Sequence, residues 1–398
     1  MRTKYNARAL AHDTSLAPAA RAALLGFSDI VKIRNRVLDM TERGLKVLRL
    51  EGGEPFEPTP EFIKQAMKEA LDANQTRYAP SSGIPQLLNA IVSKLAASNG
   101  IHVDAKQVIV TCGGAHGLFC AFQATVNPGD DVLLFSPYWT PIRDHITYAG
   151  GQPVRVPWDE VRDTADAGGV LAKYVTPKTR VLYLNTPGNP TGDVLDREQM
   201  LSIARFAVAH DLVVIADEAY EGLVHEGQHV SAASLPGMAS RTLTVYTLSK
   251  SFAMTGWRVG YVVADEPWMD VLRKLVLNST NGVSTPSQFA AAAAVTRGAE
   301  FVERMRPEYR QRRDKLVDAL NGAGFRCLTP PGAFYVFPDV RERLGNDSWK
   351  AMETLLERTS IASVPGIVFG PEGEGHLRMS SSLTGNVLDE AVEALKKV

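Results

Sequence analysis

Cysteine is scarce in this sequence, which has only three among 398 residues. Cys112, Cys120 and Cys327 make an odd number in a long chain, so we expect no disulfide framework. A reducing cytosol fits this usage best, and we predict a cytoplasmic protein. Cys112 lies in a glycine-rich stretch, where we interpret it as a small apolar residue that ends a buried strand.

Long apolar runs and an excess of charge are also missing. No run approaches the ~18 apolar residues of a membrane span. The formal net charge is −1, so no long-range field is expected to attract nucleic acid or an anionic membrane. We therefore expect no nucleic-acid partner, no membrane partner and no metal site. A net charge near zero still leaves room for a small basic pocket.

The sequence does have enough apolar residues for a large interior. Hydrophobic residues make up 45% of the chain, which is ample for two domains, or for one large and one small domain. Short apolar runs without strict alternation, typical of strands buried on both faces, alternate with amphipathic stretches. This order predicts a mostly parallel sheet covered by helices. The strand-like runs are Val108–Thr111, Val132–Ser136, Arg180–Asn185, Leu212–Asp217 and Leu243–Leu248, and the helical candidates are Pro85–Ser98, Ala115–Val126, Asp196–His210 and Pro267–Leu277.

The pattern changes after about residue 300. A long charged amphipathic stretch, Glu300–Leu320, precedes a short apolar segment at Gly332–Phe337 and a helix near Trp349–Thr359. A strand-like segment, His376–Ser380, and a helix from Val387 close the chain. These features predict a second, smaller α+β domain.

We divide the chain accordingly. The large domain is expected at residues 49–300 and the small C-terminal domain at 301–398, with residues 1–48 forming an N-terminal arm and part of the small domain. Residues 1–27 carry arginine and alanine with few acids, as a transit peptide does. A structured arm is favoured, because no cleavage-like boundary precedes the first strand.

Lys250 lies just past the carboxyl end of a strand-like run, where ligands of α/β sheets gather. A lysine there can form a Schiff base with an aldehyde cofactor if its amine is partly neutral. Two hydroxyls and one guanidinium lie in the same stretch, and they can together hold a phosphate. These groups belong to Thr247, Ser249 and Arg258. The alternative is a surface lysine in a polar loop.

Asp217 ends another apolar run, in the stretch Asp217-Glu-Ala-Tyr220. An acid at such a position is costly to bury unless it is paired. Asp217 can pair with a protonated pyridine nitrogen, the partner that a pyridine cofactor needs in order to accept electrons. Tyr220 can reach a phenolate oxygen on the same ring. A helix N-cap aspartate beside an ordinary half-buried tyrosine is the alternative.

A rigid turn follows a third strand, in Asn185-Thr-Pro-Gly-Asn189-Pro-Thr-Gly192. Two prolines and two glycines in eight residues fix an irregular backbone. Such a turn can direct Asn189 toward a cofactor oxygen or a substrate carboxylate, and we predict a cis bond between Asn189 and Pro190. A plain proline–glycine loop is the alternative.

Two glycines, Gly113 and Gly114, join a strand to a helix. Exposed amides at a helix N-terminus bind phosphate, although a glycine pair alone is weak support. For His116, in the first turn of this helix, we favour a structural or capping role. In Ser136-Pro-Tyr-Trp139, also past a strand, an aromatic face can stack on a cofactor ring or fill a domain seam.

Arg378 lies in the last strand-like segment. Its guanidinium can clamp a carboxylate through two parallel hydrogen bonds, or it can be a surface arginine. Each motif alone is ambiguous. In order along the chain, however, all of them fall at strand ends or turns, and together they supply the groups that a phosphorylated pyridine aldehyde requires.

This ordered set closely resembles the motifs of the class I aminotransferases, pyridoxal-5′-phosphate (PLP) enzymes of fold type I. The resemblance runs from about Leu48 to the C-terminus and includes Leu50-Glu-Gly-Gly53-Glu-Pro and Tyr78-Ala-Pro-Ser-Ser-Gly83. It implies a large domain with a mostly parallel seven-stranded sheet plus a smaller α+β domain. It also implies PLP as the cofactor and a homodimer with shared sites.

The resemblance further implies a role for each matched residue. Lys250 carries the cofactor as a Schiff base, and Asp217 holds the pyridinium nitrogen. Tyr220 and Asn189 contact the ring hydroxyl oxygen, and Trp139 stacks on the ring. The phosphate is met by Gly113, Gly114, Ala115, Thr247, Ser249, Arg258 and, from the neighbouring subunit, Tyr78. The substrate α-carboxylate is bound by Arg378, Asn189 and the amide of Gly53.

One position departs from part of the family. Some bacterial members have a lysine directly after the glycine pair, where it binds a second carboxylate, and Ala115 stands there in this chain. The sequence shows no obvious second arginine for an acidic side chain either. Both features weaken the interpretation as a dedicated aspartate enzyme, although the partner subunit or the arm can supply a cation.

The implied activity is transfer of an amino group between an L-amino acid and a 2-oxo acid by a ping-pong mechanism. Lys250 is expected to move the Cα proton, while Asp217 keeps the ring nitrogen protonated. The same scaffold hosts C–S lyases, other β-eliminating enzymes and a cyclopropane-forming synthase, which the cofactor motifs do not separate from transaminases. A PLP-sensing transcription regulator is disfavoured, because we find no helix-turn-helix and no basic block.

Overall fold

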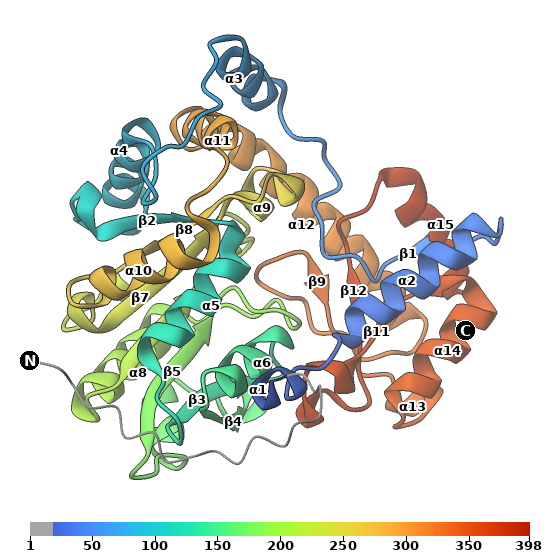
Figure 1. Ribbon diagram of the computed structural model, residues 1–398. Coiled ribbons are helices and arrows are strands. Elements are labelled where there is room, and N and C mark those ends of the chain that lie inside the picture. Colours follow the sequence, from blue (N-terminus) through green and yellow to red (C-terminus); the bar gives the residue numbers. More distant parts are fainter. Residues whose placement is uncertain (1–18) are drawn as a thin grey trace, which may run out of the picture.

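The computed structural model describes residues 19–398, so the beginning of the expected arm, residues 1–18, lies outside the described residues. A seven-stranded sheet with its helices forms one part, and the N-terminal helix α2 lies with the C-terminal elements in the other (Figure 1). No helix in residues 19–398 is long and apolar enough to cross a membrane.

The large sheet has the strand order β2-β8-β7-β6-β5-β3-β4. Neighbouring strands are parallel except at β8, which runs antiparallel to both β2 and β7. The prediction of a mostly parallel seven-stranded sheet is therefore confirmed, although β4 and β8 were not among the strand-like runs. The strands are β2 (Val108–Thr111), β3 (Asp131–Ser136), β4 (Gln152–Pro157), β5 (Thr179–Asn185), β6 (Val213–Asp217), β7 (Thr242–Thr247) and β8 (Gly260–Val263).

Both faces of this sheet are covered, which explains why its strands lack strict alternation. On β6, Ile215 packs into a hydrophobic cluster with α5 (Gly113–Thr125) and α10 (Trp268–Thr280) on one face. The adjacent Val214 packs with α7 (Ala167–Ala172) and α8 (Arg197–Ala209) on the other. Because successive side chains of a strand point to opposite faces, the inner positions of the central strands are mostly apolar on both faces.

The second part combines the two ends of the chain. Its small antiparallel sheet has the order β11 (Val364–Pro365), β12 (Leu377–Ser380) and β9 (Tyr335–Val336). Near it, β1 (Leu48–Arg49) pairs in parallel with β10 (Ile361–Ala362), and Leu48 and Leu50 join the C-terminal hydrophobic cluster. The covering helices are α12 (Ala299–Gly322), α14 (Ser348–Thr359) and α15 (Gly385–Leu395).

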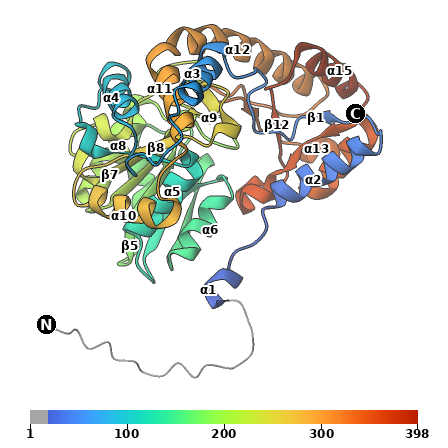
Figure 2. The ribbon, with the colours of Figure 1, turned by 45° about the horizontal axis from the view of Figure 1, so that its top comes forward.

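Helix α2 (Asp29–Glu42) lies beside the C-terminal helices in both views (Figures 1 and 2). Its Ile33 and Val37 pack into a cluster with Leu356 and Phe369. This packing agrees with an N-terminal segment joined to the small domain, while the boundaries at residues 48 and 300 stay predictions. The remaining helices are α1 (Ala20–Ala23), α3 (Glu61–Asp72), α4 (Pro85–Lys94) with the π-helix η1 (Leu95–Asn99), α6 (Pro141–Tyr148), α9 (Leu248–Ser251), α11 (Thr285–Arg297) and α13 (Arg341–Leu344).

The parallel strands β5, β6 and β7 are neighbours, and their carboxyl ends lie at one edge of the sheet. Asn185 at the end of β5 is in register with Asp217 at the end of β6. Thr247 ends β7, and Lys250 follows it in α9. The sheet therefore gathers side chains from three separate motifs at one edge.

We expect Ile215→Ala to destabilise the protein, because Ile215 is fully buried in the central strand. Truncation of such a side chain costs about 2–5 kcal/mol, so the midpoint of urea unfolding followed by circular dichroism should fall clearly. The control is Val208→Ala on α8, because the Val208 side chain is 42% exposed. Its free energy of unfolding should change by no more than about 0.5 kcal/mol. Equal losses in the two variants would contradict this account of the core.

Candidate active site

A cavity of about 650 Å³ lies at the carboxyl edge of the large sheet. Its walls come from β6, β7, α5 and α9 of the sheet-containing part, and from α2, β9 and β12 of the other part. The predicted site residues that line it are Gly53, Gly114, Ala115, Trp139, Asn189, Asp217, Tyr220, Thr247, Ser249, Lys250, Arg258 and Arg378. One cavity therefore collects motifs that lie far apart in the sequence.

Lys250 extends into this cavity from the short helix α9, which begins directly after β7. Thr247 caps the helix, since its hydroxyl accepts a hydrogen bond from the amide of Ser249 at 3.2 Å. The Lys250 Nζ donates to the carbonyl oxygen of Gly53 at 2.5 Å. It also lies 5.8 Å from the ring centroid of Tyr220. A capped helix and an acceptor across the cavity thus orient the amine.

Asp217 is only 5% exposed at the end of β6. Its Oδ2 accepts a hydrogen bond from the Tyr183 hydroxyl at 2.8 Å, and its Oδ1 accepts one from the amide of Ala219 at 3.3 Å. Burial raises the pKa of Asp217 to about 6, because it outweighs the two hydrogen bonds, which lower the pKa. The carboxylate is thus ionised at neutral pH in a place where a bound cation would stabilise it.

The N-terminus of α5 forms a cradle for an anion. Gly113 has a φ of +76°, and a Cβ on it would collide with Nη2 of Arg258. The amide nitrogens of the first helical turn are available to a ligand, and Thr247 donates from its Oγ1 to the Ser249 hydroxyl at 2.9 Å. Helix amides, hydroxyls and a guanidinium thus surround one end of the cavity, which suits a phosphate group.

His116 has the capping role that we favoured. Its Nδ1 accepts a hydrogen bond from the amide of Cys112 at 3.1 Å, and its Nε2 lies 2.9 Å from the hydroxyl of Ser279. The ring therefore ties the first turn of α5 to α10. Burial lowers the pKa of His116, so the ring is neutral at neutral pH and its Nδ1 can serve as the acceptor.

Arg378 is buried, with 3% exposure, so the alternative of a surface arginine is wrong. Its Nη1 donates to Oδ1 of Asn189 at 3.2 Å, and its Nη2 donates to the carbonyl oxygen of Glu51 at 2.7 Å. The guanidinium carbon lies 4.5 Å from the ring centroid of Tyr335. These contacts hold the guanidinium in one orientation at the cavity wall. Next to this contact, the predicted cis bond between Asn189 and Pro190 is confirmed.

Two predicted residues do not line the cavity. Gly113 lies beneath the guanidinium of Arg258, where it allows that side chain to approach the helix. The side chain of Tyr78 is 91% exposed. Its expected contact is with the site of a neighbouring subunit.

The sequence analysis missed several cavity residues. Tyr335 is the most important of them, because its hydroxyl lies 2.9 Å from that of Tyr220 and its ring packs under Arg378. Arg34 of α2 and Arg49 of β1 add two cations to the wall. An amphipathic pattern in residues 29–42 was the available signal for α2, whereas nothing in the short apolar segment around Tyr335 set that residue apart.

The donor set fits the phosphorylated pyridine aldehyde expected from the sequence. A buried carboxylate, a lysine amine and an anion cradle face one cavity. The Nε atom of Arg378 is buried and has no hydrogen-bond partner among the described residues. Such an unsatisfied donor marks a place for a further acceptor, as a substrate carboxylate would supply.

Comparisons with known proteins agree with this interpretation. The model of the family "Aminotransferase class I and II" matches residues 46–395. The aspartate/prephenate aminotransferase of Thermus thermophilus is 37% identical over 381 residues, covering 93% of this chain and 96% of that protein. The aromatic-amino-acid aminotransferase 2 of Thermococcus litoralis is 39% identical over 369 residues, covering 91% and 94%. The solved structure of the Thermus thermophilus aspartate aminotransferase with maleate superposes with a TM-score of 0.90 at 36% identity, covering 96% of this chain and 99% of that one.

We expect Asp217→Asn to stabilise the cofactor-free protein at neutral pH. The pKa of about 6 in the folded protein lies above the ordinary aspartate value of 3.8, so protonation of Asp217 favours the folded state at low pH and this contribution is lost as the pH rises through 6. The variant should gain up to about 3 kcal/mol in urea unfolding at about pH 7.5 and little at about pH 4. An equal effect at both pH values would show that the charge of Asp217 is not the cause.

Proposed function

Because the chain belongs to the class I and II aminotransferase family, and is therefore an enzyme that transfers an amino group, we propose that it does so with PLP bound in the 650 Å³ cavity and with Lys250 as the attachment point. The main support is one observation. The Lys250 amine, the Asp217 carboxylate and the α5 anion cradle face the same cavity, the first two from the ends of the neighbouring strands β7 and β6. The cofactor, when bound, supplies an electron sink for charge that develops on the substrate.

Asp217 holds a proton on the pyridine nitrogen in this proposal. Its carboxylate is ionised above a pKa of about 6, and it is buried with the hydroxyl of Tyr183 as its nearest donor. A pyridinium would therefore receive a close, desolvated counter-ion. Such a pair keeps the nitrogen protonated at neutral pH, where a free pyridine would lose its proton.

Lys250 moves the substrate proton. With a substrate in the cavity, the Lys250 amine would lie beside the reacting carbon, where it would take the Cα proton and return it nearby. The Gly53 carbonyl and the Tyr220 ring limit the positions that Nζ can occupy. This restriction raises the effective concentration of the base at the proton.

Arg378 binds the α-carboxylate of the substrate. Asn189 and the Glu51 carbonyl fix the guanidinium, and its free Nε donor can complete a bidentate pair. The amide of Gly53, which also lines the cavity, adds a further donor. An α-carboxylate fixed at these points leaves the amino group directed toward Lys250.

The side-chain subsite favours no single donor. Ala115 leaves the position after the glycine pair without a charge, but Arg34 lines the cavity from α2 and can meet a second carboxylate. Two relatives are named for aspartate or prephenate and for aromatic amino acids. We propose aspartate and phenylalanine as the first donors to test, with a 2-oxo acid as the acceptor. No observation favours the C–S lyase.

We also propose a homodimer with shared sites. The large ring of Tyr78 is 91% exposed, and Leu71 and Leu277 are also exposed apolar residues. A tyrosine that is exposed to this extent can contribute its hydroxyl to a second chain. In this arrangement Tyr78 of each subunit reaches the phosphate end of the other subunit's cavity.

The half-reaction tests the proposed function. Purified protein with PLP should convert a suitable amino acid, without any acceptor, into one equivalent of 2-oxo acid, with a change in the cofactor absorbance. Lys250→Ala should lose the absorbance of the lysine-bound cofactor, and its rate should fall by about 10²–10⁴-fold or more. Wild-type turnover in this variant would refute the role of Lys250. Ammonia released over many turnovers would identify a lyase instead.

Subunit mixing tests the shared site. Lys250→Ala and Tyr78→Ala homodimers should both be impaired, the second through weaker cofactor binding. A mixed dimer of the two variants contains one site with both defects and one site with neither. We therefore expect activity to reappear when differently tagged chains are co-expressed and the mixed dimer is isolated. No recovery would mean that Tyr78 serves its own subunit or neither.

A further inference from the structure

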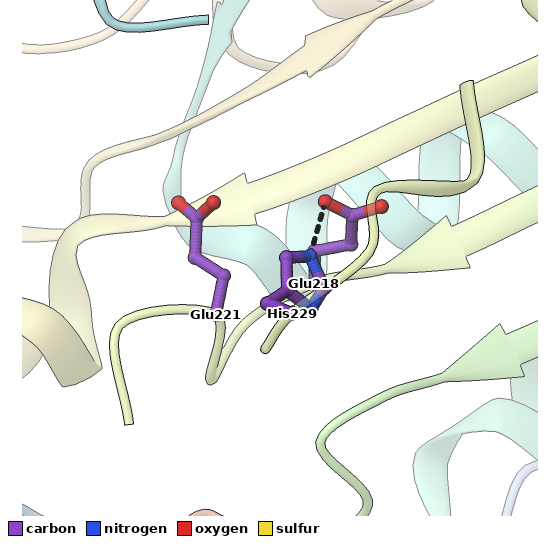
Figure 3. A group of neighbouring side chains, drawn as sticks. All are labelled: Glu218, Glu221 and His229. Carbon is purple, nitrogen blue, oxygen red and sulfur yellow. Dashed lines mark hydrogen bonds and ion pairs between the residues drawn. The ribbon is translucent and has the colours of Figure 1, made fainter. Parts of the chain in front are cut away.

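Three titratable side chains outside the proposed mechanism gather directly behind Asp217. They are Glu218, Glu221 and His229, and their ligand atoms lie within 4.8 Å of one another (Figure 3). Asp217 and Glu218 are consecutive at the end of β6, so their side chains point to opposite sides. Asp217 faces the cavity, whereas Glu218 points into this cluster.

Glu218 is fully satisfied although its carboxylate is 1% exposed. One oxygen, Oε2, accepts from the Ser231 hydroxyl at 2.6 Å and lies 2.9 Å from Nε2 of His229. The other, Oε1, accepts from the amide of Ala232 at 3.0 Å. Burial raises the pKa of Glu218, but His229 and Ser231 outweigh it and lower the pKa below its usual value. The carboxylate is therefore ionised at neutral pH.

Lys94 already supplies a cation to the third member of the cluster. Its ammonium group is hydrogen-bonded to Glu221, and its Nζ lies 4.6 Å from the ring centroid of Tyr246. Asn99, in the π-helix η1, donates to Glu221 at 2.8 Å. With two carboxylates, one lysine and one histidine, the cluster is balanced by groups of the chain itself. This balance argues against a metal ion.

The Glu218 contacts close the base of a loop that carries site residues. Residues 219–231 leave β6, pass Ala219 and Tyr220 along the cavity, and return at Ser231 and Ala232, which bond to Glu218. Midway, Val224 forms a β-bridge with Gly332 of the other part of the chain. The hydrogen bonds to Glu218 therefore fix both ends of the loop that begins next to Asp217 and carries Tyr220.

We infer that Glu218 and His229 form a buried positioning pair, which holds the loop with Asp217 and Tyr220 in place and balances the negative charge next to Asp217. The inference rests on the proposed function, since it gives Asp217 its role at the cofactor. Neither residue touches the cavity.

The charges of Glu218 and His229 act on Asp217 in opposite directions. Asp217 is surrounded by Glu218, Lys250 and the hydroxyls of Tyr183 and Tyr220. Of the two charged neighbours, Glu218 raises the pKa of Asp217 and Lys250 lowers it. Around His229 lie Glu218, Glu221 and Lys94. Burial lowers the pKa of His229, but Glu218 outweighs it and raises the pKa, which favours the charged imidazole beside Glu218. Its positive charge therefore offsets the effect of Glu218 on the site.

The test is a pH titration of the holoenzyme, read from the absorbance of bound PLP. His229→Gln removes a positive charge and should raise the titration midpoint by on the order of 0.5 pH unit, the size expected for one nearby buried charge. Glu218→Gln removes the negative charge together with the group that raises the pKa of His229, so the imidazole loses its charge as well and the midpoint should stay close to that of the wild type. The double variant likewise carries neither charge and should also stay close to the wild-type midpoint.

The matched control is His225→Gln in the same loop. His225 lies 2.6 Å from the carbonyl oxygen of Ala333, and burial lowers its pKa to about 4, so it is neutral. Its replacement disturbs a loop contact without a change of charge, and the midpoint should stay. If Glu218→Gln does not fold, the contrast between His229→Gln and His225→Gln decides alone.

Three results would overturn the inference: no shift in His229→Gln, an equal shift in His229→Gln and Glu218→Gln, or one equivalent of bound metal found by elemental analysis. A wild-type protein without any PLP spectrum would instead overturn the proposed function. The two failures are therefore distinguishable.

Discussion

The site depends on one buried carboxylate. Asp217 ends the central strand at 5% exposure and accepts hydrogen bonds from two neutral donors, the Tyr183 hydroxyl and the Ala219 amide. A buried carboxylate without a close cation is costly, so the fold keeps a charge that a cationic ligand can stabilise. The cores on both faces of the sheet supply the rigidity that holds it there, and the lysine, the anion cradle and the arginine are arranged around it.

The strand ends could be predicted because they belong to strands buried on both faces. In such strands an apolar run stops abruptly at a polar residue, as at Asn185, Asp217 and Thr247. Strands β4 and β8 were missed for local reasons. β4 contains two prolines at the edge of the sheet, and β8 has only four residues directly after the Lys250 stretch.

The rest of the site depends on contacts between distant segments, which spacing does not encode. Tyr335 reaches Tyr220 because β9 pairs with β12 in a register that sets Tyr335 opposite Ser380. The burial of Arg378 likewise depends on Glu51 and Asn189, which are hundreds of residues away. From this segment of the sequence alone, a surface position was the favoured interpretation for this arginine.

The cavity has two walls that belong to separate hydrophobic cores. One wall carries Lys250, Asp217 and the α5 anion cradle, and it packs on the core of the large sheet. The other wall carries Arg34, Arg49 and Arg378, and it consists of elements contributed by the two ends of the chain. If the proposed function holds, substitutions at Arg34 and Arg49 would therefore alter which amino acid is accepted without disturbing the residues that would hold the cofactor. Such a division makes substrate preference easy to change during evolution, and it gives a laboratory library on α2 and β1 a natural boundary.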